Sequence, residues 1–230
     1  MGRFKETVAV AALAAGVAFS GSGCGAEGAH ALAEDKLLME TSFNEAKEFW
    51  LAQGLGKASA TKLIILEGSD SFDCLVTDSE PTYSDDTAVS VCDKPDTTML
   101  VVPAGRLNKL RALDKQAELS TNEELKGLPN GAIRGSAHYW AGRIVQTEAT
   151  GILANISSDP DRAKEQSAAQ AVCLAGVSVR HSPNAAVVTR DIQLGFAHVS
   201  PMEGDPKLPY SIGYESTAPP REACLIAPGQ

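Results

Sequence analysis

Basic side chains are scarce in this chain of 230 residues, which has 20 lysines and arginines against 29 aspartates and glutamates. The formal net charge is −9 and the isoelectric point is near 4.9. Nucleic-acid phosphates require a Lys/Arg-rich face that releases counterions, and anionic lipid head groups attract basic segments. The composition therefore excludes nucleic acid as a partner and offers no electrostatic attraction to a membrane surface.

Several catalytic motifs are also missing. The sequence has no G-x-S-x-G segment and no G-x-x-x-x-G-K segment, so a serine hydrolase elbow and a phosphate-binding P-loop have no support. None of the 5 cysteines belongs to a C-x-x-C pair, which argues against a cysteine metal site. The function has to be sought in other patterns.

A long apolar run occurs at the N-terminus. Arg3 and Lys5 precede the apolar stretch from Val8 to Phe19. A short basic region followed by about a dozen apolar residues is typical of an export signal, and the stretch is too short to span a bilayer. We therefore expect residues 1–24 to direct export.

The export signal is expected to end in a lipobox. Small residues precede Cys24, as at the acylation site of a bacterial lipoprotein, although Gly21 stands where leucine is usual. The alternative is ordinary secretion, with cleavage near the triplet Ala29–Ala31. Cys24 is thus the candidate lipid anchor, and the chain is expected in the bacterial cell membrane or envelope.

The other four cysteines, Cys74, Cys92, Cys173 and Cys224, would lie in an oxidising compartment. Two disulfides are the natural expectation there, with three possible pairings. Proximity in the sequence favours Cys74–Cys92 and Cys173–Cys224. Each bridge would stabilise the fold by about 3 to 4 kcal/mol in the chain-entropy description.

The rest of the chain is expected to form a flexible Gly/Ala-rich tether, 25–40, and a single domain, 41–230. A capping box of Ser42 and Glu45 predicts the start of the first helix, and Gly54 predicts its end. The Pro-rich tail is expected to be irregular until Cys224 anchors it.

Aliphatic and β-branched runs predict strands at 62–66, 87–91 and 98–102, in a small and mostly antiparallel sheet. Leucines at helical spacing predict a helix at 106–119. Two further helices follow within Gly135 to Gly176, the second of them capped by Asp159 with proline at its first position. These elements predict an α+β fold built around two central helices.

The two central helices carry motifs of a known family. The marks are a Phe49-Trp50 pair, the segment VSVCDKPDTTMLVVPAGRLNKL, AH…GRIVQ on the first central helix and QAVCLAGVSVRH on the second. Across roughly 49–224 the chain resembles the putative neutral zinc metallopeptidases of zincin type, which are exported or membrane-anchored bacterial proteins. The resemblance implies a zincin-like fold, in which the first central helix carries HExxH and the second carries a further zinc ligand.

The chelating residues of that family are missing from the matching positions. The histidines and catalytic glutamate of HExxH correspond to Tyr139, Trp140 and Arg143, and the further ligand corresponds to Ala168. A vacated zinc site would favour bulky or apolar replacements, because an unpaired buried charge is costly. Arg143 is expected to reach solvent, to pair with an acid such as Glu165, or to point into the former substrate cleft.

These substitutions predict a degenerate, non-catalytic metallopeptidase-like protein that has no cofactor and binds a peptide or protein in the envelope. The alternative is an active zinc metallopeptidase with non-standard ligands, for which His138 and Glu165 are the nearby candidates. A structural envelope component without a binding cleft is a third possibility.

Overall fold

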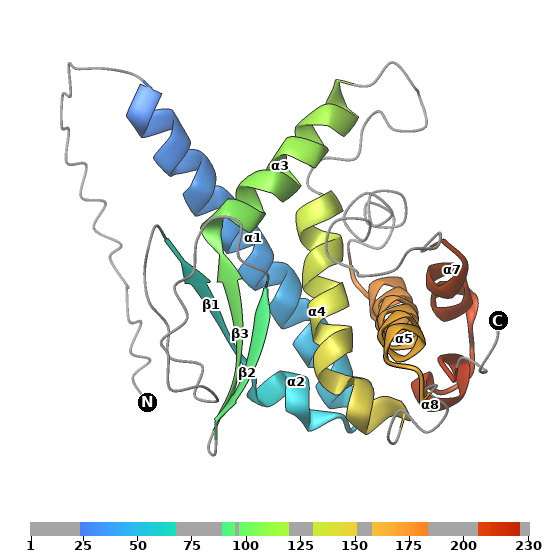
Figure 1. Cartoon of the computed structure of the whole chain (residues 1–230). Coiled ribbons are helices and arrows are strands. Elements are labelled where there is room, and N and C mark those ends of the chain that lie inside the picture. The colour runs from blue at the N-terminus through green and yellow to red at the C-terminus, as the bar shows by residue number, and fades with distance from the viewer. Residues whose placement is uncertain are drawn as a thin grey trace, which may run out of the picture.

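The structure of the chain is a computed structural model that describes residues 24–67, 89–94, 97–119, 131–150, 158–183 and 207–225. Residues 1–23, with most of the export signal and lipobox, and Cys74 lie outside these ranges. The elements in chain order are α1 (Cys24–Ala52), α2 (Gly56–Ala60), β1 (Lys62–Leu66), β2 (Ser90–Lys94), β3 (Thr97–Pro103), α3 (Ala104–Glu118), α4 (Gly131–Thr150), α5 (Pro160–Arg180), α7 (Lys207–Glu215) and α8 (Pro220–Ala223) (Figure 1).

The described sheet has three strands in the order β1-β3-β2. The central strand β3 pairs antiparallel with β2 but parallel with β1, with Lys62 opposite Met99 and Ser90 opposite Val101. The α+β expectation is confirmed, whereas the expected mostly antiparallel sheet is corrected to a mixed one. Turn-rich segments between apolar runs do not distinguish a hairpin from a longer crossover.

The two faces of β3 serve different packing surfaces. Leu100 and Val102 lie in the main hydrophobic core, whereas Met99 and Val101 pack in a smaller cluster with Cys92 of β2. This alternation follows from the period of two along a strand. The sheet therefore has one face against the helices and a second, smaller apolar cluster on the other.

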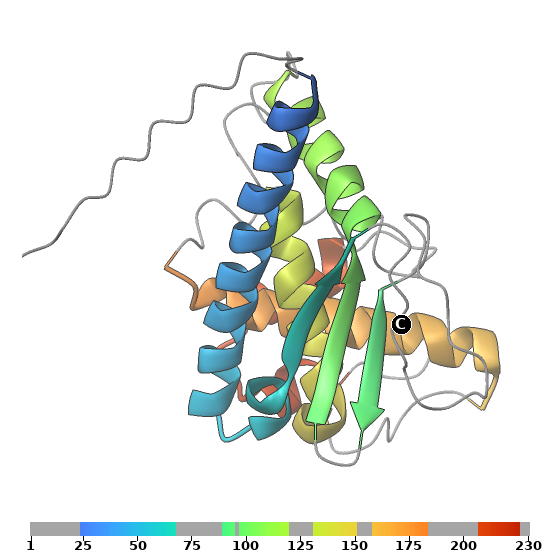
Figure 2. The same ribbon diagram turned by 90° about the vertical axis from the view of Figure 1, so that its left-hand side faces the viewer.

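Helix α4 is the central element of the helical part. It contacts α1, α2, α3 and α5, and in Figure 1 it lies between the sheet and α5, with α7 beyond α5. Figure 2 shows the three strands in front, α1 along one side and α5 crossing behind. The side of α4 toward α1 contributes Ile133, Ala137, Ala141 and Ile144 to the main core, together with Phe43 and Trp50 of α1 and other residues.

The expected tether at 25–40 is instead the first half of α1, which corrects that prediction. Its four alanines are strong helix formers. Met39 is fully buried in the main core. Asp35, 1% exposed, accepts a hydrogen bond from Nε of Arg111 on α3 at 2.9 Å; burial raises the pKa of its carboxyl, while Arg111 lowers it. Because the segment is tied to α3, it is part of the folded domain.

The expected capping box is also wrong, because Ser42 lies inside α1 and is fully buried. The Glu45 carboxylate instead accepts a hydrogen bond from the Ser182 hydroxyl at 3.0 Å. The predicted stop is confirmed: α1 ends at Ala52, and Gly54 has a φ of +75°, which suits a residue without a Cβ.

Side chains from neighbouring segments fix where α4 and α5 begin. The Asp114 carboxylate of α3 accepts a hydrogen bond at 2.8 Å from the backbone N–H of Ala132 in the first turn of α4. The predicted cap of α5 is confirmed, since Asp159 accepts from the N–H groups of Asp161 and Arg162 and Pro160 occupies the first helical position.

Within the described ranges, no helix has the length and apolar character needed to cross a bilayer.

The expected irregular tail is corrected by α7 and α8, which form despite the prolines. Helix α7 packs against α5 at its glycines. A Cβ built on Gly213 would lie 1.9 Å from the carbonyl oxygen of Cys173, and one on Gly176 would lie 2.4 Å from that of Tyr210. Helix α7 therefore depends on tertiary contact rather than on its own sequence.

We expect Gly213→Ala to lower the free energy of unfolding by about 3 kcal/mol, because the added methyl meets backbone that cannot move aside as a flexible side chain would. Gly56→Ala is the matched control, since a Cβ at Gly56 meets nothing within 4 Å. Urea unfolding of both variants measures the difference. Equal stability of the two variants would show that the close α5–α7 contact does not form.

Candidate functional site

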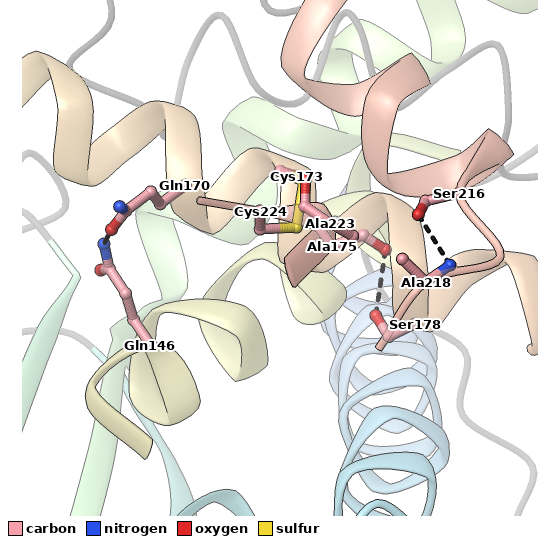
Figure 3. Close-up of a disulfide and its surroundings, with 9 residues drawn as sticks. All are labelled: Gln146, Gln170, Cys173, Ala175, Ser178, Ser216, Ala218, Ala223 and Cys224. Carbon is pink, nitrogen blue, oxygen red and sulfur yellow. Dashed lines mark hydrogen bonds between the residues drawn. A yellow bond between two sulfur atoms is a disulfide. The ribbon is translucent and has the colours of Figure 1, made fainter. Parts of the chain in front are cut away.

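Helices α4 and α5 cross antiparallel, and hydrogen bonds mark both ends of the contact. The His138 ring lies 2.8 Å from the Ser178 hydroxyl. At the other end, the amides of Gln146 and Gln170 form a hydrogen bond of 2.8 Å (Figure 3). Between these two pairs, a Cβ built on Gly142 would lie 2.9 Å from the carbonyl oxygen of Ala171. Small residues thus allow the two backbones to come close.

The positions corresponding to HExxH lie in or beside this contact. Tyr139 is buried and packs with Ala171, Val172 and neighbouring residues of α5 and α7. Trp140 is partly buried between this cluster and the main core, and its ring meets Tyr139 edge-on at 5.2 Å. Ala168 is fully buried. Aromatic and apolar groups therefore occupy three of the four positions at which the resemblance would place metal ligands or the catalytic glutamate, and the fourth is Arg143.

Arg143 has two neutral partners. Its Nη1 donates to Oε1 of Gln146 at 2.9 Å and to the hydroxyl of Ser167 on α5. The anticipated pairing with Glu165 does not form, and that side chain is exposed. Gln146 in turn donates from Nε2 to the Ser167 carbonyl at 3.0 Å and to Gln170. These amide and hydroxyl groups hold the arginine at the crossing.

His138 is 1% exposed. Burial first, and the nearby positive charge of Arg134 second, lower the pKa of its ring to about 4. The Ser178 hydroxyl donates to the Ala175 carbonyl at 3.0 Å (Figure 3). A hydroxyl has one hydrogen, so the arrangement that satisfies both contacts has Nδ1 of His138 donating to Ser178. Nε2 of the ring is buried, and none of the residues that the structure describes forms a hydrogen bond with it.

The structure does not bring the two alternative ligands, His138 and Glu165, together. His138 meets α5 at Ser178, thirteen positions after Glu165, which corresponds to about 20 Å along a helix. In the described ranges, no three His, Cys, Asp or Glu side chains gather where they could hold a metal ion.

The predicted disulfide between Cys173 of α5 and Cys224 is confirmed (Figure 3). Their Cα atoms are 5.7 Å apart, and both residues are fully buried. The other predicted bridge, Cys74–Cys92, stays a prediction because Cys74 lies outside the described residues, although Cys92 is buried in β2. The candidate lipid anchor Cys24 is the first residue of α1.

Sequence reasoning used Gln146 and Gln170 only as letters of family motifs and missed their contact. Their hydrogen bond joins residues 24 positions apart, and so does the contact between Arg143 and Ser167. The polar residues on the otherwise apolar inner face of α5 were the available signal, because buried amides need partners.

No family model matches the chain, and no curated protein or solved structure does either. The zincin resemblance therefore stays a prediction from the motifs.

Proposed function

We propose that this chain is an exported, lipid-anchored, metallopeptidase-like protein of the bacterial envelope that is non-catalytic and binds a peptide or protein. The observation that supports this best is the packing of the α4–α5 crossing. Tyr139 and Ala168 are buried there among apolar groups, and Arg143 is held by Gln146 and Ser167. A positively charged guanidinium at this place disfavours a divalent cation and suits a ligand of opposite charge.

The alternative zinc peptidase is less well supported by the same geometry. His138 already uses Nδ1 for Ser178, its ring is buried, and Glu165 lies near the opposite end of α5. Moving either residue to a common metal would require α4 and α5 to repack. No observation favours that rearrangement.

Zinc content separates the two functions. The full chain, purified in detergent and dialysed against buffer containing zinc and then against metal-free buffer, is expected to retain far less than one zinc per chain by elemental analysis. His138→Asn and Glu165→Gln are expected to leave that value unchanged. Stoichiometric zinc that is lost in either variant would contradict the proposal and favour the enzyme.

A further inference from the structure

Arg143 is a partly buried cation at the α4–α5 crossing, and no negative charge of the described residues compensates its own. Both of its partners are neutral, and within the described ranges no carboxylate lies within ion-pair distance of it. Arg111 shows the contrast, because its guanidinium meets the carboxylates of Asp35 and Glu34. A ligand that brings a negative charge to Arg143 would therefore add a charge-assisted hydrogen bond that the described residues do not supply.

The free donors of Arg143 have the geometry of a carboxylate receptor. A guanidinium carries five N–H donors in a planar fork, and a carboxylate accepts two parallel bonds from that fork. Both hydrogen bonds to Gln146 and Ser167 come from Nη1. In the part of the chain that the structure describes, Nε and Nη2 have no acceptor, so an edge of the fork is available to a ligand.

The fork is also held in place. Gln146, which accepts from Arg143, is itself fixed by bonds to Gln170 at 2.8 Å and to the Ser167 carbonyl at 3.0 Å. These partners come from both helices, so the arginine is positioned by the crossing and not by α4 alone. A side chain fixed in this way loses little conformational entropy when it binds, which favours affinity.

We infer that Arg143, positioned by Gln146 and Ser167, binds a carboxylate group of the peptide or protein partner. This inference rests on the proposed binding function and adds the chemistry of the ligand. The chain has a net charge of −9, so its overall field does not attract acidic ligands. Recognition therefore depends on the short-range hydrogen bonds of the guanidinium fork. A lysine has the same charge concentrated on one ammonium group, so it cannot form the two parallel hydrogen bonds and cannot replace arginine.

The test uses the full chain in detergent and four acetylated tetrapeptides. Ac-Ala-Ala-Ala-Ala with a free C-terminus is compared with its amide, and Ac-Ala-Ala-Glu-Ala amide is compared with Ac-Ala-Ala-Gln-Ala amide. The first pair tests a terminal carboxylate and the second a side-chain carboxylate. The readouts are the ¹H–¹⁵N signals of Arg143 Nε–Hε and Trp140 Nε1–Hε1, titrated to millimolar peptide.

At least one carboxylate peptide is expected to shift the Arg143 signal while its amide counterpart does not. Arg143→Lys is expected to weaken that binding by about tenfold or more, because bonds to the fork are lost. Arg162→Gln is the matched control, since Arg162 is exposed in the first turn of α5; its affinity should equal that of the wild type. A wild-type-like ¹H–¹⁵N spectrum of Arg143→Lys shows that the variant is folded.

Two results would overturn the inference in different ways. If carboxylate and amide peptides shift the spectrum equally, or if Arg143→Lys and Arg162→Gln bind alike, the carboxylate assignment fails while peptide binding stands. If none of the four peptides changes any signal of the chain, the result counts against both the carboxylate assignment and the proposed binding function.

Discussion

Replacing Cys173 and Cys224 together by alanine is expected to lower the free energy of unfolding by about 4 kcal/mol. The bridge joins residues 51 positions apart and ties the C-terminal tail to α5. Without the bridge, a long loop of the unfolded chain regains conformational freedom, which stabilises the unfolded state. Both cysteines are also buried in the core, so their replacement removes packing contacts as well. The shift in the urea midpoint at pH 7.5, with the m-value, gives the difference.

The matched control is the pair Thr217→Ala and Leu225→Ala, which trims two exposed side chains of the same tail. Its effect should stay within about 1 kcal/mol for the two surface changes together. A cysteine variant as stable as this control would show that the tail is held by packing alone and that the bridge contributes nothing.

Acid should destabilise the fold through His138 by roughly 3 kcal/mol between pH 7.5 and pH 4. In the unfolded chain the pKa of the imidazole is at its ordinary value of 6.5, and in the folded chain it is about 4. Between these values the unfolded state binds the proton and the native state does not. Stability is therefore complete above pH 6.5, declines as the pH falls toward 4, and declines no further from this group below it.

His138→Asn tests this effect, because asparagine has no charge to gain and can still donate to Ser178. Urea unfolding at several pH values should show a weaker decline in the variant than in the wild type, by roughly 3 kcal/mol at pH 4. His181→Asn is the control, since His181 is exposed and its variant should follow the wild type. If the stability of the wild type and of His138→Asn declined equally with falling pH, the result would show that the His138 ring is exposed to water and not buried.

Local chemistry predicted several elements correctly. The aliphatic run at 62–66 is β1, the leucines predicted α3, and the Asp159-Pro160 cap starts α5. The Cys173–Cys224 bridge followed from proximity and compartment. For the strand and the two helices the signal lies within a few residues, so it does not depend on the tertiary structure. The disulfide differs, because residues 51 positions apart can pair only when the fold brings them together.

Long-range packing decides the elements that were predicted wrongly. Ser42 was predicted to cap the start of the first helix. Instead α1 continues through Ser42, because Met39 and Asp35 in the preceding turns are buried in the folded domain. Helix α7 forms in a Pro-containing segment because Gly213 lies against Cys173 of α5. The first half of α1 and the tail therefore take their structure from contacts that a local pattern does not contain.

The site was predictable in position and not in detail. The motifs identified the α4–α5 pair and the residues Tyr139, Trp140, Arg143 and Ala168 that occupy it. They did not give the partners of Arg143, because the choice between Glu165 and Ser167 depends on the rotation of α5. Glu165 faces solvent and Ser167 faces the crossing, so a difference of two residues changes an ion pair into a neutral contact.

The most direct test of a binding role without metal is the dissociation constant of the carboxylate tetrapeptide, measured with and without a strong zinc chelator. The same constant is expected in both conditions, with an intact peptide at the end of the titration. Loss of binding in chelator would show that binding requires zinc, and peptide cleaved in the absence of chelator would identify a zinc-dependent enzyme; either result would contradict a binding role without metal.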